Sequence, residues 1–462
     1  SSKSGHPFHI FGNSMRPKAQ EKEKDAEAGL DIRAAKLSID KPIHVNEHPF
    51  QNDGEGADNG PDDEDKEMTL DVVYTRCCHL REILPIPSTL RQVTGKSAPL
   101  HVLKFLNPRP TLIDILSFCD FISIVPINTV VFDKVSLTPE MFQVIVTSLV
   151  HSRALEKLSL RNVVINREGW RLLCKFLVLN RSITKLNISQ TRTKSDADNR
   201  DQMDWPLFTH VLRKRRGKPL EELLLNGVRF DKLPPEHFCQ LLTAFAEQPG
   251  LQTGIRLGVA ASEINSECMK FLLSWMSKYN VQGVDFGYND LSAYVKLIAN
   301  KLSTLNYERL EYLTLNSSCL PSGNDLGLLL KYLVALPRLK FLDISNLPQC
   351  FPEALTFLHK YLPKFPQLSR IHVDNDNLSF KNLSLLCTIF PKCRSLNHVS
   401  IQGQALTAPI DGEPSEEVSQ FTRNALAANL LALVKNSPNL VNLDVDYDEV
   451  PCLLYTSPSP RD

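Results

Sequence analysis

The feature that most constrains this chain is a recurring six-position pattern: an apolar residue, two variable ones, an apolar one, one variable one and another apolar one. Leu155, Leu158 and Leu160 form one copy. Successive copies start about 28 to 30 residues apart, and two longer intervals coincide with the polar insertions Arg192 to Asp204 and Thr407 to Glu417. A degraded copy starts at Leu251, with Ile255 and Leu257 slightly displaced. The remaining copies are Leu100/Leu103/Phe105, Ile127/Val130/Phe132, Ile183/Leu186/Ile188, Leu220/Leu223/Leu225, Val281/Val284/Phe286, Leu310/Leu313/Leu315, Leu339/Leu342/Ile344, Leu368/Ile371/Val373, Leu396/Val399/Ile401 and Leu440/Leu443/Val445.

Segments with helical spacing separate these copies. Thr138 and Pro139 supply an N-cap and a first-turn proline, and apolar residues then recur at i, i+3, i+4 and i+7. Each unit is thus a short strand and a helix whose apolar face only a neighbouring unit can cover. The sequence predicts an α/β solenoid of about 12 repeats, with a parallel concave sheet and helices on the convex side. The apolar helix positions are Phe142, Ile145, Val146 and Leu149; Trp170, Leu173, Phe176 and Leu177; and Met269, Leu272, Leu273 and Met276.

The length of the unit and its helix resemble the ribonuclease-inhibitor-like leucine-rich repeats, which implies a horseshoe. The ninth position of such repeats is usually Asn or Cys, because its side chain satisfies backbone groups in the turn. Here only Asn289 fits, with Asp376 and Asp448 as substitutes. We therefore expect somewhat irregular curvature. Other ninth positions hold Val135, Val163, Thr191, Val228, Ser318, Leu347 and Gln404.

Composition divides the chain into four parts. Residues 1–68 are polar and end in the acidic stretch Asp53 to Glu67, so we expect them to be disordered. Residues 69–99 form an N-terminal cap, and residues 100–451 form the repeat domain. Residues 452–462 break the repeat and look like a non-native tail.

Charge and cysteine usage restrict the environment. Lys plus Arg equals Asp plus Glu at 52 each, so we expect neither nucleic acid nor a membrane as partner. The 11 cysteines form no C-x-x-C motif, which favours a reducing compartment and a cytoplasmic protein. A basic string allows a nuclear alternative; otherwise it is the solvated end of a helix beginning near Trp205. The string comprises Arg213, Lys214, Arg215, Arg216 and Lys218.

A second resemblance precedes the first repeat, in Tyr74, Cys78, the pair Ile86-Pro87 and the run Leu90-Arg91-Gln92. These residues resemble a segment in the family of protein phosphatase 1 regulatory subunit 37. The resemblance implies a regulatory scaffold that binds the protein phosphatase 1 catalytic subunit. Phosphatase partners generally dock through a basic-Val-x-Phe strand, but we assign the nearest strings here to the core. They are Gly227 to Phe230, Gly283 to Phe286 and Lys134 to Leu137.

No catalytic signature occurs: the chain has no phosphate-binding glycine loop, no H-E-x-x-H and no G-x-S-x-G. We therefore predict a non-enzymatic protein-binding scaffold with no cofactor and no metal. Two alternatives remain open, a GTPase-activating horseshoe resembling RanGAP and a substrate adaptor of a ubiquitin ligase. The sequence leaves the oligomeric state unknown.

Partner-binding residues are expected on the strands, where template positions two, three, five and seven face the concave side. Their charges run from basic to acidic along the chain, so we expect a protein partner of opposite polarity. An ordinary solvated face is the alternative. The first half contributes Lys104, Lys157, Arg161, Lys185 and Arg256. The second half contributes Asp285, Glu311, Tyr312, Phe341, Asp343, Arg370, His372, Asp374, Asp444 and Asp446, with Tyr312 and Phe341 as apolar anchors.

Overall fold

A computed structural model describes residues 68–191, 200–404 and 416–446. The chain divides into two compact units within the single repeat domain expected over 100–451. We call the first, which covers the described residues up to 228 and 232–253, the N-terminal unit. The second, the C-terminal unit, covers 229–231 and the described residues from 254 onward. The expectations for the tail at 452–462 and for the segment up to residue 67 lie outside the described residues.

Each unit is built from alternating strands and helices. Within each unit the strands pair in parallel with the next strand in the chain, and strand order follows chain order, from β1 to β5 in the N-terminal unit and from β6 to β12 in the C-terminal unit. The N-terminal unit contains α3 (Leu70–Leu80), α4 (Pro87–Val93), β1 (Leu100–Phe105), α5 (Leu112–Ile124), β2 (Ile127–Phe132), α6 (Pro139–Leu149), β3 (Lys157–Ser159), α7 (Arg167–Leu179), β4 (Lys185–Asn187), the 3₁₀ turn η5 (Arg200–Gln202), α8 (Trp205–Lys214), β5 (Glu222–Leu224) and α9 (Pro235–Ala246).

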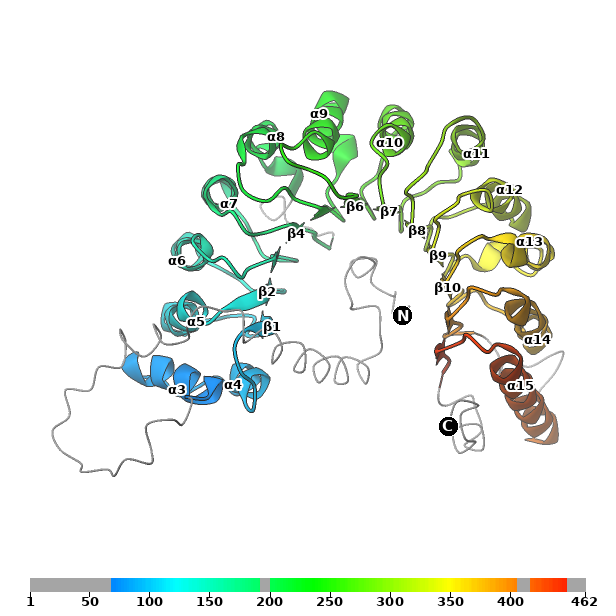
Figure 1. Ribbon diagram of the computed structural model, residues 1–462, viewed down its shortest axis with the longest axis horizontal. Helices are drawn as coiled ribbons and strands as arrows, with labels where there is room; N and C mark the ends of the chain where they lie inside the picture. The colour runs from blue at the N-terminus through cyan, green and yellow to red at the C-terminus, as the bar shows by residue number, and fades with distance from the viewer. Residues whose placement is uncertain (1–67, 192–199, 405–415, 447–462) are drawn as a thin grey trace. The chain divides into compact units, whose positions relative to one another are not determined.

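The C-terminal unit repeats the same alternation, and the 3₁₀ turn η6 (Phe230–Lys232) lies where the chain passes between the units. Its elements are β6 (Arg256–Gly258), α10 (Ser266–Lys278), β7 (Gly283–Asp285), α11 (Val295–Thr304), β8 (Tyr312–Thr314), α12 (Gly323–Leu333), β9 (Phe341–Asp343), η7 (Pro348–Cys350), α13 (Ala354–Tyr361), η8 (Leu362–Lys364), β10 (Arg370–His372), α14 (Phe380–Ile389), η9 (Phe390–Lys392), β11 (His398–Ser400), α15 (Glu416–Asn436) and β12 (Asn442–Asp444). Within each unit the strands line one face and the helices the other, and the unit curves toward its strands (Figure 1). The predicted α/β solenoid is confirmed.

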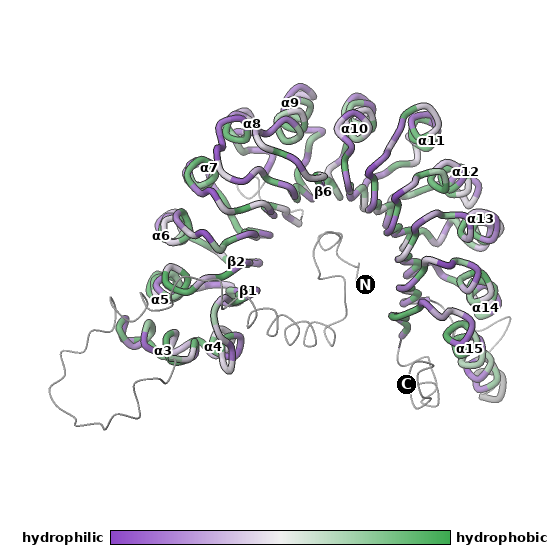
Figure 2. Tube along the Cα trace, in the orientation of Figure 1, coloured by the Kyte–Doolittle hydropathy of each residue, from purple (hydrophilic) through white to green (hydrophobic). Residues whose placement is uncertain are grey.

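The core of each unit lies between strands and helices. The apolar anchors of the copies from β1 to β11 are buried, as Leu158 and Leu342 show at 0% exposure, whereas Leu440, Leu443 and Val445 of the last copy are half-buried. So are the predicted helix positions, including Trp170 and Leu273. Figure 2 shows hydrophobic and hydrophilic residues alternating within every repeat, which is the pattern expected when each repeat covers only its neighbours.

The copy predicted at Leu251 is displaced in the structure. Leu257 pairs with Val284, so it holds the fourth position of the pattern and the copy starts at Gly254. A Cβ at Gly254 would lie 2.8 Å from Cβ of Gln282, which explains why no leucine stands there. The copy was misread because its first anchor is a glycine.

A left-handed residue marks the turn after most strands. It lies two positions beyond the last anchor and has positive φ whether or not it is glycine. Asn and Gly tolerate this conformation best. The ninth position is also polar more often than expected, since Gln404 as well as Asn289 and Asp376 bonds the preceding repeat. Asp448 lies outside the described residues. The left-handed residues are Lys134, Asn162, Gly227, Ala261, Tyr288, Ser317, Asn346, Asn375 and Gly403.

The N-terminal cap closes the first end of the core. Tyr74 and Cys78 are fully buried, and the Tyr74 hydroxyl accepts a hydrogen bond from the Ile86 amide at 3.2 Å. Gln92 bonds both the amide and the carbonyl of Lys104 in β1. The motif that carried the phosphatase resemblance therefore has a structural role here: it joins α3 and α4 to the first strand.

Candidate protein-binding surface

The strand face of each unit presents the side chains that alternate with the buried anchors. Because successive strand residues point to opposite sides, the residues between two anchors project away from the helices. All the residues expected to bind a partner lie in these strands or within two residues of them. The structure gives them different surroundings in the two units, so each unit is described in turn.

In the N-terminal unit, basic side chains meet acidic ones from neighbouring repeats. Arg161 binds Asp133 with its Nη2 2.7 Å from the carboxylate, and Nζ of Lys157 lies 3.9 Å from Glu222. Lys185 is half-buried beside them in β4. Asp133 and Glu222 were not among the partner-binding residues expected from the sequence, although both occupy strand-face positions of the pattern. The face expected to be basic is therefore largely compensated internally.

In the C-terminal unit, the register aligns side chains into rows across the strands. What we call the first row runs through Arg256, Gly283, Tyr312, Phe341, Arg370 and His398. The second row, two residues further along each strand, runs through Gly258, Asp285, Thr314, Asp343, His372, Ser400 and Asp444. The first row holds Arg256, Arg370 and the aromatic rings, while the second holds three carboxylates, those of Asp285, Asp343 and Asp444.

A polar chain runs beside the first row. Arg256 donates to the Gln282 side chain at 2.9 Å, Gln282 donates to Glu311, and Glu311 binds Lys340 at 2.8 Å. Burial opposes ionisation of Glu311, but the bonds from Lys340 and Gln282 outweigh it and lower its pKa. The Lys340 side chain stays 45% exposed, against 16% for Glu311. The cation is thus the more accessible member of the pair.

The second row is turned inward. Asp285 and Asp343 are each 1% exposed, and each accepts a bond from the backbone amide two residues on, at 2.8 and 2.9 Å. Burial raises the pKa of Asp285 well above its usual range and that of Asp343 to about 6. These aspartates hold the turn after their strands and are not accessible to a partner in this structure.

Beyond the second row, Asp374 and Asp446 also accept hydrogen bonds from backbone amides, but from amides of a neighbouring repeat. Asp374 accepts bonds from the Ser400 hydroxyl and the Gln402 amide, both at 2.7 Å, and burial raises its pKa to about 7. Asp446 accepts a bond from the Gly403 amide at 2.7 Å. Three of the six carboxylates of this face, Asp285, Asp343 and Asp444, are thus buried, whereas the cations Arg256, Lys340 and Arg370 keep intermediate exposure. The gradient along the chain expected from the sequence is therefore accompanied by a difference in exposure across the strands.

An aromatic and imidazole cluster ends the first row. The Arg370 guanidinium lies 5.2 Å from the Phe341 ring centroid, and its Nε donates to Nε2 of His372 at 2.8 Å. Phe341 meets His372 edge-on at 5.1 Å, and His372 stacks on His398 at 5.6 Å. Burial, with the adjacent Arg370 charge, holds the pKa of His372 well below its usual range. Neutral His372 can therefore accept the hydrogen bond that orients Arg370.

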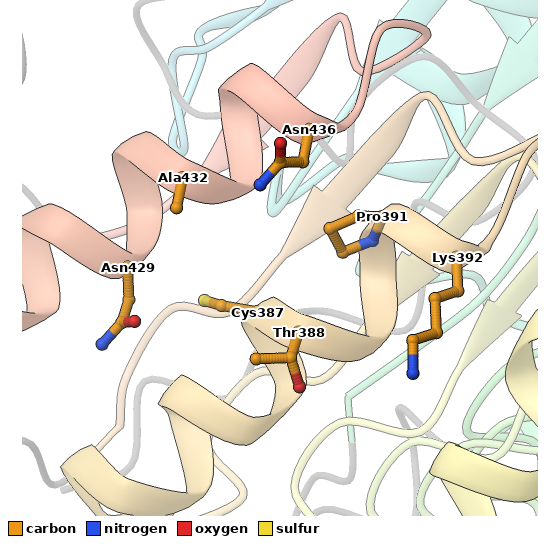
Figure 3. A pocket seen from close by; sticks show the side chains of 7 residues that line it. All are labelled: Cys387, Thr388, Pro391, Lys392, Asn429, Ala432 and Asn436. Carbon is orange, nitrogen blue, oxygen red and sulfur yellow. The ribbon is translucent and has the colours of Figure 1, made fainter.

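One hollow in the described part of the chain lies between α14 and α15. It holds about 330 Å³ and is lined by Cys387, Thr388 and Asn429 among others (Figure 3). Burial raises the pKa of Cys387 to about 12, so its thiol is a poor nucleophile. Within the described ranges, no three His, Cys, Asp or Glu side chains meet as a metal site requires. No helix among the described residues is long and apolar enough to cross a membrane.

Solved structures with repeat architectures give weak overall matches. The yeast Rad7 chain in its complex with Elc1 is 12% identical, with 86% of this chain and 93% of that chain covered and a TM-score of 0.43. LegL7, a leucine-rich repeat-containing protein from Legionella pneumophila, is 14% identical, with 69% and 92% covered and a TM-score of 0.45. Both scores are too low to bear on function.

Sequence relatives are much closer. HMG2-induced ER-remodeling protein 1 of Saccharomyces cerevisiae is 54% identical over 95% of this chain, and MAP-homologous protein 1 of the same yeast is 34% identical over 82%. The aligned regions are 36% and 28% of those proteins, so the chain spans about a third of the length of the curated relatives it matches. The model of the MHP1/HER1/GIP3 LRR domain matches residues 70–404. The chain therefore belongs to the MHP1/HER1/GIP3 leucine-rich-repeat family.

Proposed function

We propose that this chain is a non-enzymatic scaffold that binds a protein partner on the strand face of its C-terminal unit. The observation that carries the proposal is the first row together with Lys340, which directly precedes it at Phe341: the side chains of Tyr312 and Lys340 stay partly exposed although the core does not require them. Interfaces are enriched in Tyr and Arg near their centre. A row of this kind suits an extended partner surface better than an enclosed small molecule, which needs a deep and mostly apolar pocket.

The relatives bear on the setting of this scaffold. The printed name of the 54% identical relative assigns endoplasmic-reticulum remodelling to that protein. We propose that the shared repeat domain is the part that recruits a partner in such a process, and that the domain works in the cytoplasm, with the nucleus as the alternative. Free thiols at the described cysteines, most of them buried, suit that reducing setting.

A protein phosphatase catalytic subunit is the more specific partner that we propose, and the structure restricts how it would bind. Val228, Phe230, Val284, Phe286 and Val135 are at most 3% exposed, so the three candidate docking strings are core strands and turns. A phosphatase catalytic subunit would have to use the strand face instead. No observation favours the RanGAP-like or ubiquitin-adaptor alternatives over this one.

Affinity capture with the full chain and two matched variants tests the proposal. Tyr312→Ala removes a strand-face ring, while Tyr332→Ala removes a ring from helix α12 on the opposite side. Proteins that Tyr312→Ala loses and Tyr332→Ala retains would support the strand face as the binding surface. Identification of those proteins by mass spectrometry then selects among phosphatase, Ran-like and ubiquitin-ligase partners. Equal capture by both variants and the parent chain would refute the proposed surface.

A further inference from the structure

We propose that the first row of the C-terminal unit recognises an acidic segment of its partner, in which Asp or Glu side chains flank an apolar residue. The inference rests on the proposed scaffold function and adds the chemistry of the partner. It contradicts the simplest reading of the sequence, which counts more carboxylates than cations on these strands. The inference rests instead on how exposed each charged side chain is and on where it lies in the strand register.

The cations share one side of the strand face. Arg256 and Arg370 lie in the first row, and Lys340 directly precedes Phe341 of that row. Neighbouring strands are about 4.8 Å apart, and the three cations are spread over the five strands from β6 to β10. An extended segment crossing the strands would meet each in turn. Tyr312 lies between them and offers an apolar contact.

The carboxylates are committed within the protein. Asp285 and Asp343 bond backbone amides and are buried, and Asp374 and Asp446 bond amides of the turn after β11. Glu311 is the remaining acid beside the first row, and it is bonded by both Lys340 and Gln282. An approaching acidic segment therefore meets three partly exposed cations, while three of the six carboxylates of this face, Asp285, Asp343 and Asp444, are buried.

Arg370 is held in place before any partner arrives. The Phe341 ring lies beneath its guanidinium, and His372 fixes its Nε by accepting a hydrogen bond. Because the side chain is already oriented, less conformational entropy is lost when it binds a carboxylate. Nε is engaged by His372 and Nη2 is buried, so Arg370 contributes an oriented positive charge rather than two parallel hydrogen bonds.

The test measures binding of a labelled peptide to the full chain by fluorescence anisotropy. The probe is a short peptide in which glutamates flank a single tryptophan, and its comparison replaces every glutamate with lysine. We expect only the glutamate peptide to bind, with affinity that weakens as salt rises. Lys340→Glu should weaken binding about tenfold, because it removes an attraction and adds a repulsion. Lys331→Glu, on helix α12 of the preceding repeat, should leave the affinity unchanged.

Three outcomes would overturn the inference: equal binding of the two peptides, equal loss with Lys331→Glu, or affinity independent of salt. Circular dichroism of Lys340→Glu establishes that it folds, and Arg256→Glu provides a second, independent variant. The experiment also separates the two proposals. Cellular partners that depend on Tyr312 while the glutamate peptide fails to bind would remove the acidic chemistry and leave the scaffold proposal intact.

Discussion

His398 and Asp444 join the last two strands of the C-terminal unit, with Nε2 and Oδ2 2.7 Å apart and both side chains less than 10% exposed. In the sequence, the two residues lie on either side of the polar insertion Thr407 to Glu417. Loss of one partner from a buried pair is costly because the other is left uncompensated. The contact therefore helps to hold β12 and α15 on the preceding repeat.

Asp444→Ala should loosen β12 without disturbing the middle of the unit. We expect the amides of β12 and α15 to exchange hydrogen at least about tenfold faster, a change of roughly 1.4 kcal/mol. Hydrogen exchange with mass spectrometry measures this, and β8 and β9 serve as internal controls. Unchanged exchange in β12 would show that the pair contributes nothing to the attachment of the last strand.

Gly227→Ala should destabilise the N-terminal unit by about 3 kcal/mol. Gly227 has a φ of +82°, and an added Cβ would lie 1.8 Å from the Gln190 carbonyl oxygen. Gly95→Ala is the matched control, because Gly95 has a φ of +72° and nothing lies within 4 Å of its Cβ position. The control should cost about 1 kcal/mol, the backbone contribution alone. Urea unfolding of both variants checks this, and equal losses would contradict the close approach.

Arg215→Met should cost about 3 kcal/mol or more, since charged hydrogen bonds to several carbonyls disappear together. Arg215 was expected to be part of a solvated basic string, yet it is 2% exposed and donates to the carbonyls of Leu177, Ile183 and Lys218, among others. It fixes the end of α7 to the loop after α8. Arg216→Met, at an exposed position in the same string, should change stability little. Thermal unfolding compares the two, and similar melting shifts would argue against the buried role.

The repeat was predictable because buried positions recur with the period of the pattern. Apolar residues at those positions, such as Leu158 and Leu342, can therefore be recognised in the sequence. The helix after each strand followed from the same logic. Gly254 escaped detection because close packing against Gln282 requires the anchor to be absent, and a missing side chain leaves no apolar signal. The division into two units depends on how tightly neighbouring repeats pack, and the six-position pattern carries no information about that packing.

The candidate surface was predictable in position but not in charge. Strand alternation places Tyr312 and Arg370 on the strand face. Asp285 and Asp343 lie on the same face two positions further along the pattern, yet their carboxylates turn onto backbone amides, which a list of positions cannot reveal. The pairing of Arg161 with Asp133 depends on contact between repeats. Formal charge therefore predicted a gradient along the chain, and hydrogen bonding and burial add a difference in exposure across the strands.

The free energy of unfolding should depend on pH because buried aspartates bind protons more tightly in the folded chain than in the unfolded chain. Burial raises the pKa of Asp374 to about 7, with the charges of Asp343 and Asp444 adding to the effect. The folded chain thus retains a proton that the unfolded chain releases near pH 3.9. Stability from this group should fall as pH rises from about 4 to about 7 and then level off.

Asp374→Asn should remove that loss, because the amide oxygen still accepts the bonds from Ser400 and Gln402 while the charge is gone. Relative to the parent chain, we expect the variant to gain about 1 to 3 kcal/mol between pH 4.5 and pH 8, as measured by urea unfolding at both values. Asp290→Asn provides a control of opposite sign. Bonds from Ser292 lower the pKa of Asp290, so its stabilising contribution is present at pH 8 and is lost as pH falls. A pH-independent difference for Asp374→Asn would mean that this carboxylate is already ionised at low pH in the folded chain.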